Sequence, residues 1–187
     1  MGGEALTAYA ALLRAVNVGG TGIIKMAALK VLCEAAGFAK VATLLQSGNV
    51  VFTAGGSDET VAKKLADSIE ASHGFRPAIV VRTVAEIADA VTRNPFAAAA
   101  RDDPGHMLVA FTADLPTAGA AERLKAVKVA GERFALSRRE LFVHYPDGVG
   151  TSKVTNTVLE RALGVPATAR NWNTIEKLLA LAAKLEA

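Results

Sequence analysis

The chain has 187 residues, of which 51% are hydrophobic and 21% are charged. This composition argues against disorder and favours one ordinary domain or two small ones with a sizeable core. Its 21 basic and 18 acidic residues leave a net charge of only +3, a weaker imbalance than extensive nucleic-acid coating usually shows, although a local basic patch stays open.

The first half alternates extended and helical patterns. Residues 6–16 carry apolar side chains on both alternating faces, as a buried strand does, and an apolar helical stripe follows up to the cap at Gly37. Ser47-Gly48 suits a hairpin turn, and Thr83 with Glu86 has the spacing of a capping box. The expected elements are a strand at 6–16, a helix at 25–37, strands at 40–46 and 49–54, a helix at 57–74, a strand at 77–82 and a helix at 83–93.

The second half repeats this order after a segment, 94–105, that two prolines mark as a linker. A second hairpin is centred on Arg138-Arg139, and Gly164 follows the second helix as a cap. The two halves share little letter identity, so the repeat lies in the order of elements. The expected elements are a strand at 106–113, a helix at 117–127, strands at 132–137 and 140–146, a helix at 152–164, a strand at 167–170 and a helix at 173–187.

The order β-α-β-β-α-β in each half is that of the ferredoxin-like fold. We therefore predict an α+β protein made of two duplicated ferredoxin-like (α-β plait) units, each with an antiparallel sheet that helices cover on one face. The units are expected at 1–93 and 106–187, with 94–105 as the linker. A doubly wound sheet is disfavoured because it needs helices where the two hairpins stand.

In this topology the first strand ends beside the first hairpin turn and the start of the first helix. Free backbone N–H groups at a helix start favour anions, so this first polar edge is a candidate ligand site. A strict dinucleotide fingerprint is excluded because Lys25 stands where a third glycine is needed, and a P-loop is excluded because Gly-Lys-Ser/Thr is absent. The candidates are Arg14, Asn17, Gly19, Gly20, Lys25, Gln46, Ser47 and Asn49.

A purely structural explanation competes at this edge. The glycines of residues 19–22 can serve a tight turn, in which Gly19 or Gly20 is expected at positive φ. Asn17 and Asn49 are common turn residues, and Arg14 can bond to loop carbonyls instead of a ligand.

A second polar edge is expected where residues 148–153 meet residues 170–174. If it binds phosphate, Lys153 and Arg170 should face a shared concavity and Trp172 should keep one ring face exposed for stacking. The alternative is that Trp172 is a packing anchor and that Asn173 or Thr174 caps the last helix. The candidates are Ser152, Lys153, Arg170, Asn171, Trp172 and Asn173.

Two blocks of the sequence carry a resemblance to a known family. "RAVNVGG" (14–20), "KM" (25–26) and "LQSGNVVF" (45–52) resemble the opening of the bacterial domain-of-unknown-function family 1697, and "SKVT" (152–155) with "TARNWNT" (168–174) resembles its close. The chain departs from the family pattern at Ala15, where glycine is usual, and at Val154, where leucine is usual. The resemblance spans nearly the whole chain and implies a duplicated α-β plait without implying an activity.

The single cysteine, Cys33, excludes an intrachain disulfide and fits a reducing compartment. The N-terminus is a poor signal peptide, and no apolar stretch is long enough to span a membrane, so a cytoplasmic protein is expected. His73, His106, His144 and Cys33 lack metal-ligand spacing. We therefore expect no metal and no cofactor.

These observations favour a binding module for a phosphate-bearing ligand, either a nucleotide or a single-stranded nucleic acid. Two other hypotheses stay open. One is a small enzyme of unknown reaction in which Ser47, Ser152 or Lys153 acts beside backbone N–H groups at a glycine-rich helix start. The other is a protein-interaction module, suggested by strands that are apolar on both faces.

Overall fold

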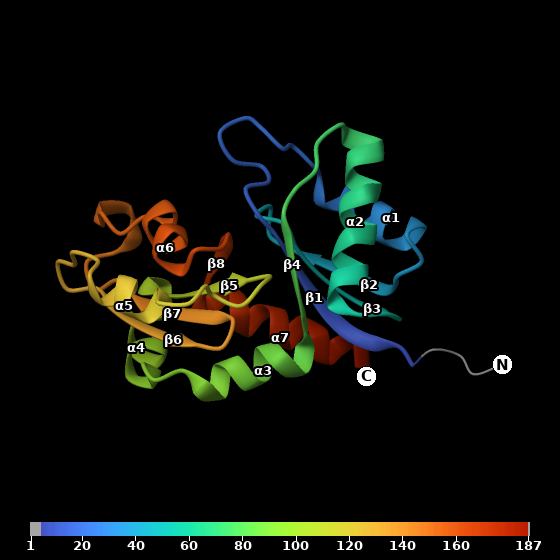
Figure 1. The fold of residues 1–187 in the computed structure, drawn as a ribbon. Helices are drawn as coiled ribbons and strands as arrows, with labels where there is room; N and C mark the ends of the chain where they lie inside the picture. The colour runs from blue at the N-terminus through green and yellow to red at the C-terminus, as the bar shows by residue number, and fades with distance from the viewer. Residues whose placement is uncertain (1–4, 187) are drawn as a thin grey trace. The chain divides into compact units, whose positions relative to one another are not determined.

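The computed structural model describes residues 5–186 of the chain (Figure 1). The chain divides into two compact units, which we call unit 1 (Met1–Ala88 with Lys177–Ala187) and unit 2 (Asp89–Glu176). Two helices cross this division, α3 (Val84–Arg93) and α7 (Trp172–Glu186). Each unit is described by itself below.

Unit 1 holds a four-stranded antiparallel sheet in the order β2-β3-β1-β4, which is the ferredoxin-like order. Helices α1 and α2 lie on the same face of this sheet (Figure 1). Its elements are β1 (Thr7–Leu13), α1 (Met26–Ala35), β2 (Ala39–Leu44), β3 (Asn49–Ala54), α2 (Asp58–His73) and β4 (Ile79–Thr83).

Unit 2 repeats this arrangement with a second antiparallel sheet in the order β6-β7-β5-β8. The predicted fold class, a duplicated α-β plait, is therefore confirmed. Its elements are α4 (Ala97–Asp102), a 3-10 turn η1 (Pro104–His106), β5 (Met107–Thr112), α5 (Ala120–Lys125), β6 (Arg133–Ser137), β7 (Glu140–His144), a 3-10 turn η2 (Val149–Thr151), α6 (Asn156–Leu163) and β8 (Ala167–Asn171).

The segment expected as a linker, 94–105, contains helix α4 and most of η1. The unit division also assigns residues after Glu176 to unit 1. The predicted division into a first subdomain (1–93), a linker (94–105) and a second subdomain (106–187) therefore stays a prediction.

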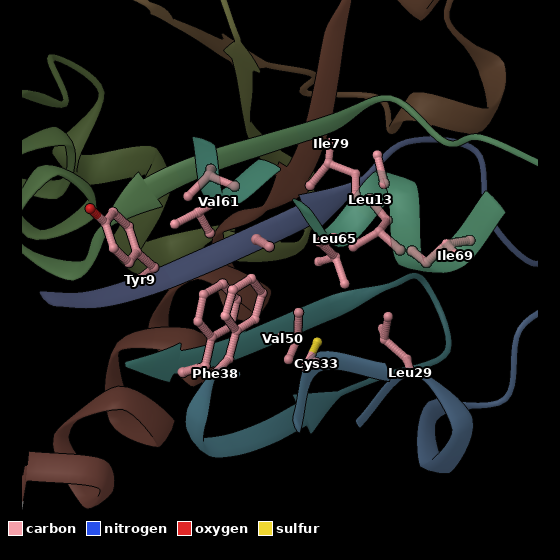
Figure 2. Packing of buried hydrophobic residues seen from close by; sticks show 14 of the residues in the cluster. Tyr9, Leu13, Leu29, Cys33, Phe38, Val50, Val61, Leu65, Ile69 and Ile79 are labelled. Carbon is pink, nitrogen blue, oxygen red and sulfur yellow. The ribbon is translucent and has the colours of Figure 1, made fainter. Parts of the chain in front are cut away.

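The core of unit 1 lies between its sheet and its two helices (Figure 2). The rings of Phe38 and Phe52 stack with centroids 4.4 Å apart and planes 9° apart. Tyr9 packs beside Phe52, and its hydroxyl donates to the carbonyl oxygen of Gly56 at 2.6 Å. Cys33 is fully buried in this core, and burial raises the pKa of its thiol to about 12, so it behaves as an inert apolar residue.

The helix ends follow their sequence signals. Ser57 caps α2 by accepting from the backbone N–H of Thr60, and Gly74 ends it in the left-handed conformation. The capping box is formed as predicted, since the backbone N–H of Thr83 donates to Glu86 at 2.8 Å and that of Glu86 donates to the Thr83 hydroxyl at 3.0 Å.

The first crossover helix of unit 2 is shorter than its sequence pattern predicts. In place of a helix over 117–127, α5 spans six residues, because Gly119 sits at φ +80° just before it and the chain turns irregular after Ala126. The core of unit 2 is built on the contacts of α5 and α6 with the sheet, through Leu124, Leu141 and Leu159. Residues 126–132 thus form an irregular segment instead of further helix.

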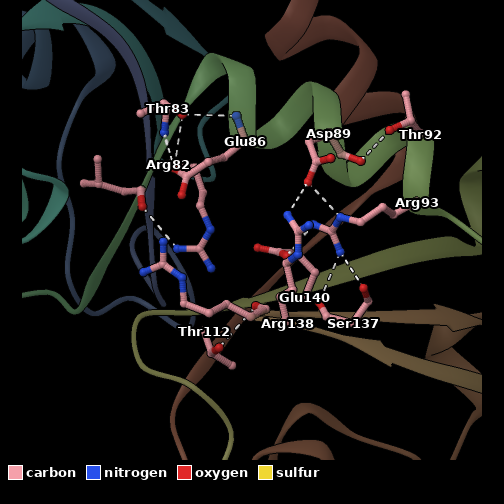
Figure 3. A network of polar contacts seen from close by, with 12 residues as sticks. Arg82, Thr83, Glu86, Asp89, Thr92, Arg93, Thr112, Ser137, Arg138 and Glu140 are labelled. Atoms are coloured by element: carbon pink, nitrogen blue, oxygen red, sulfur yellow. Dashed lines mark hydrogen bonds and ion pairs between the residues drawn. The ribbon is translucent and has the colours of Figure 1, made fainter.

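A polar network fixes the β6–β7 hairpin within unit 2 (Figure 3). Arg93 donates to Asp89 and to Glu140 at 2.8 Å each, and to the Ser137 hydroxyl at 2.6 Å. Arg138 at the hairpin tip also donates to Asp89 at 2.8 Å. Both arginines are therefore paired with carboxylates of unit 2.

Candidate functional site

The glycines of the first polar edge form a tight turn. Gly19 and Gly20 have φ of +62° and +76°, and the backbone N–H of Thr21 donates to the Val18 carbonyl at 3.2 Å. Positive φ at both central residues is the signature of a type I′ turn. A Cβ at either glycine would meet nothing within 4 Å, so the turn needs glycine for its backbone conformation. The prediction of positive φ is confirmed.

Asn17 holds the loop between β1 and α1 in place. Its side-chain amide donates to the carbonyls of Ile24 at 2.9 Å and Gln46 at 2.7 Å, and its side-chain oxygen accepts from the Ile24 N–H at 2.9 Å. The strand end and the hairpin turn therefore meet as the topology requires. The side-chain amide of Asn17 therefore has a structural role in this loop.

The polar groups of the hairpin turn at this edge are also hydrogen-bonded within the protein. Asn49 is fully buried and donates to the carbonyl of Leu44 and the hydroxyl of Ser47, both at 2.9 Å. A Cβ on Gly48 would lie 2.5 Å from the Val16 side chain, so no larger residue fits there. Lys25 is exposed at the start of α1, whereas Arg14 is half-buried. The first polar edge is thus a well-bonded structural junction.

The second polar edge is only partly as expected. Trp172 is 5% exposed, and its ring N–H donates to Glu176 at 3.0 Å, so the expectation of an exposed ring face is wrong. Arg170 is 8% exposed and donates to the hydroxyl of Thr168 and the carbonyl of Ala169. Burial lowers its pKa to about 10. Both side chains belong to the interior and are poorly placed for a solvent ligand.

The neighbours of Trp172 also have structural surroundings. The side-chain oxygen of Asn171 accepts from the backbone N–H and the hydroxyl of Thr174, both at 3.0 Å, so Asn171 caps α7. The expectation that Asn173 or Thr174 caps this helix is therefore wrong, and Asn173 is half-buried in the first turn.

Ser152 and Lys153 line a different region from Trp172. They border a hollow of about 380 Å³ that we call the loop hollow. Trp172 instead lines a hollow of about 430 Å³ with α4 residues. The lining of the loop hollow is Lys128, Val129, Ala130, Glu132, Tyr145, Pro146, Asp147, Gly148, Thr151, Ser152, Lys153 and Val154.

Two further hollows adjoin the irregular segment after α5. The helix hollow, of about 470 Å³, lies along α6 and is lined by Arg123, Ala126, Val127, Lys128, Lys153, Val158, Arg161 and Ala162. The strand hollow, of about 310 Å³, lies against β6 and is lined by Ala121, Leu124, Lys125, Val127, Val129, Glu132, Phe134 and Leu136.

Shared lining residues make the three hollows neighbours, and we call the three together the groove. Lys128 and Lys153 line both the loop hollow and the helix hollow, while Val127 lines the helix hollow and the strand hollow. The irregular segment that follows α5 contributes Ala126, Val127, Lys128, Val129, Ala130 and Glu132 to the lining of the groove.

The electrostatics of the helix hollow are one-sided. No acidic residue lines it. Among the residues that the structure describes, Lys128, Lys153 and Arg161 have no hydrogen bond or ion pair from their side chains. Arg123 differs, because it donates to the carbonyls of Ala162 at 2.8 Å and Ala118 at 2.9 Å. Three exposed cations therefore remain for an anion.

The loop hollow offers a possible nucleophile but a poor base. The hydroxyl of Ser152 donates to Glu132, and the backbone N–H of Ala130 donates to the same carboxylate at 2.6 Å. The Ser152 hydroxyl is the first of the contacts that lower the pKa of Glu132, and a carboxylate with a lowered pKa accepts a proton weakly. The hydrogen bonds of this pair therefore favour a structural link between segments 130–132 and 152–154 over a catalytic role.

Sequence reasoning missed Lys128 and Arg161. Val158, Arg161 and Ala162 stand at positions i, i+3 and i+4 of α6, a spacing that places them on one helix face. That spacing was a usable signal. The contribution of Lys128 had no such signal, because it depends on where the irregular segment passes.

Within residues 5–186, no group of three or more His, Cys, Asp and Glu side chains could hold a metal ion. No described helix is both long enough and apolar enough to cross a membrane.

Comparisons with known proteins agree with the fold. A family model described as "Protein of unknown function (DUF1697)" matches residues 6–142. The solved structure of the conserved bacterial protein SP0830 from Streptococcus pneumoniae is similar, with 23% identity, a TM-score of 0.71, and coverage of 95% of this chain and 99% of that one. A search of curated proteins found no match. At this identity the structural likeness supports the fold alone.

Proposed function

This chain belongs to the DUF1697 family of proteins of unknown function, and we propose that it is a binding module for a small phosphate-bearing ligand held in the helix hollow of unit 2. One observation carries the proposal. Lys128 and Lys153 stand on the wall between two hollows with side chains unpaired among the described residues, and Arg161 lines the same hollow. Unpaired cations around a concave, acid-free surface suit a phosphate group.

The size and surroundings of the helix hollow support a small ligand over a nucleic acid strand. Its volume of about 470 Å³ lies within the ordinary range for small-molecule sites. Single-stranded nucleic acids are usually held by exposed aromatic side chains on which bases stack. Trp172, the residue expected to stack, is buried and lines another hollow. We therefore favour the small-molecule half of the original hypothesis.

The enzyme hypothesis has weaker support. Ser47 accepts a hydrogen bond from buried Asn49, and Ser152 faces a carboxylate whose lowered pKa makes it a weak base. Lys153 is better suited to hold an anion, because it is exposed and its side chain has no ion pair among the described residues. The buried thiol of Cys33 agrees with the cytoplasmic location that we propose from the cysteine content.

Calorimetric titration tests the proposal. The probes are inorganic phosphate, pyrophosphate, AMP, hexyl phosphate and a short oligonucleotide, each at low and at tenfold higher salt. At least one small phosphate compound should bind and should weaken as salt rises, because the contact is ionic. The double variant Lys128→Ala/Lys153→Ala should lose that binding by tenfold or more.

The matched control is Lys30→Ala/Lys63→Ala, which removes two exposed lysines of unit 1 and the same total charge. It should bind as the unchanged protein does. Absence of binding by every probe, or equal loss in both double variants, would contradict the proposal.

A further inference from the structure

The lining of the helix hollow also bears on the part of the ligand that carries the phosphate. Resting on the proposed function, we infer that this part is an aliphatic chain, so that the ligand is a phosphate monoester of an aliphatic alcohol and not a nucleotide. Two features of unit 2 carry the inference: which chemical groups line the helix hollow, and which surface continues from it.

The side chains that line the helix hollow offer no acceptor for a base. Its lining side chains are either apolar or cationic, and none is an amide, a hydroxyl or a carboxylate. Recognition of a nucleobase normally uses both donors and acceptors, and it often adds an aromatic ring for stacking. An aliphatic chain needs neither. The apolar members of the lining are Ala126, Val127, Val158 and Ala162.

The two lysines and the apolar residues of α6 come from different segments, while Arg161 shares the α6 face with Val158 and Ala162. Lys128 and Lys153 border the loop hollow, so they define the wall where a phosphate would meet cations. Val158 and Ala162 come from one face of α6 and contribute the apolar surface. A monoester combines two negative charges with an apolar chain, and the helix hollow combines cations with apolar side chains.

The apolar surface continues beyond the helix hollow. Val127 also lines the strand hollow, where it is joined by Leu124, Phe134 and Leu136. A chain longer than the helix hollow would meet these apolar side chains beside Lys125 and Glu132, which also line the strand hollow. Each buried methylene is expected to raise affinity about fourfold, which corresponds to about 0.8 kcal/mol.

The test compares phosphate compounds that differ only in their apolar part. Inorganic phosphate, butyl phosphate, hexyl phosphate, octyl phosphate and AMP are titrated into the full chain. Affinity should rise about tenfold or more with each pair of buried methylenes, and AMP should bind more weakly than hexyl phosphate. If AMP binds as tightly or more tightly, the aliphatic inference is overturned while the proposed function stands. If no compound binds, both fail.

A pair of variants links the chain-length effect to the helix hollow. Val158→Thr keeps the side-chain shape but adds a hydroxyl to the apolar wall, and it should weaken octyl phosphate at least threefold while leaving inorganic phosphate unchanged. Val31→Thr is the control, since Val31 is an exposed residue of α1 in unit 1. Equal effects of both variants, or none at Val158, would overturn the inference.

The same chemistry can be presented by a soluble alkyl phosphate or by a lipid headgroup, and a vesicle assay separates the two. Vesicles of phosphatidylcholine with and without phosphatidic acid are mixed with the chain and sedimented. Binding that requires phosphatidic acid and is lost in Lys128→Ala/Lys153→Ala identifies a lipid source. Binding to soluble octyl phosphate without vesicle binding identifies a free monoester. Equal binding to both kinds of vesicle overturns the inference.

Discussion

Units 1 and 2 have the same strand order, but their first crossover helices differ. In unit 1, α1 spans ten residues and buries Leu29 and Cys33 in a core that also holds the stacked rings of Phe38 and Phe52. In unit 2, α5 spans six residues, and an irregular segment follows it. Each unit therefore has a buried core, and in unit 2 the residues that follow the short crossover helix line three hollows.

The polar side chains of the two units differ in whether they have hydrogen-bond partners within the protein. At the first polar edge, Asn17 and Asn49 are bonded to backbone groups and a neighbouring hydroxyl. Around the groove of unit 2, Lys128 and Lys153 are unpaired among the described residues. Glycine-rich sequence thus marked a structural junction, whereas the surface that we propose as a ligand site includes the irregular segment after α5.

The largest expected effect contrasts the two cores. Phe52→Ala should lower the free energy of unfolding by roughly 3–5 kcal/mol, because it removes a fully buried ring and its stacking contact with Phe38. Phe134→Ala should cost well under half as much, because Phe134 is half-buried and borders the strand hollow. Denaturant unfolding measures both. Equal losses would show that the groove of unit 2 is as tightly packed as the core of unit 1.

A second prediction separates the two uses of glycine at the first polar edge. Gly48→Ala should destabilise by roughly 2–4 kcal/mol, because its Cβ would collide with Val16 and Leu13 in addition to straining a φ of +79°. Thermal and denaturant unfolding of the purified variant check this. A loss below about 1 kcal/mol would mean that the hairpin turn relaxes easily.

Gly20→Ala should cost less, about 1 kcal/mol, because its Cβ meets nothing within 4 Å and only the positive φ is penalised. The same unfolding measurements apply. A loss as large as that of Gly48→Ala would point to a close contact at Gly20 that the turn geometry does not contain.

The smallest expected effect concerns pH. Asp103 accepts from His144 and His106 at 3.1 Å each, and these contacts, that of His144 first, hold the pKa of its carboxyl below the usual range. A lowered pKa in the folded state adds stability above the ordinary aspartate pKa of about 4, and this is lost as pH falls through the lower folded value.

Asp103→Asn should therefore lower Tm slightly at neutral pH and make no difference in strong acid. Asp67→Asn in unit 1 is the matched control, because Lys63 and Arg76 lower the pKa of Asp67 in the same way. Thermal melts between pH 2 and pH 7 should show converging curves for both variants. A difference for Asp103→Asn that grows in acid would contradict the assignment.

Much of the fold was predictable from local signals. Ser57 and Gly74 bound α2, and Thr83 with Glu86 starts α3, because caps depend on neighbouring residues in the chain. The start of α6 was predicted too early. Ser152 accepts from the backbone N–H of Val154, and Thr155 is the cap, so the helix begins at Asn156.

The candidate site was less predictable because it depends on contacts between distant segments. Lys153 was identified, but its partners Lys128 and Arg161 were not, since they meet only after α5 and α6 pack together. The burial of Trp172 likewise follows from tertiary packing, and no local pattern distinguishes a stacking ring from a packing ring. The sequence therefore pointed to one cation of the helix hollow, Lys153, and did not indicate the other residues that line it.

The most direct test of the central claim is the affinity of hexyl phosphate for the unchanged chain and for Lys128→Ala/Lys153→Ala, measured by calorimetry at low salt. The account predicts measurable binding by the unchanged chain, at least a tenfold loss in this variant, and no loss in Lys30→Ala/Lys63→Ala. Binding that survives removal of Lys128 and Lys153 would contradict the assignment of the phosphate to the helix hollow.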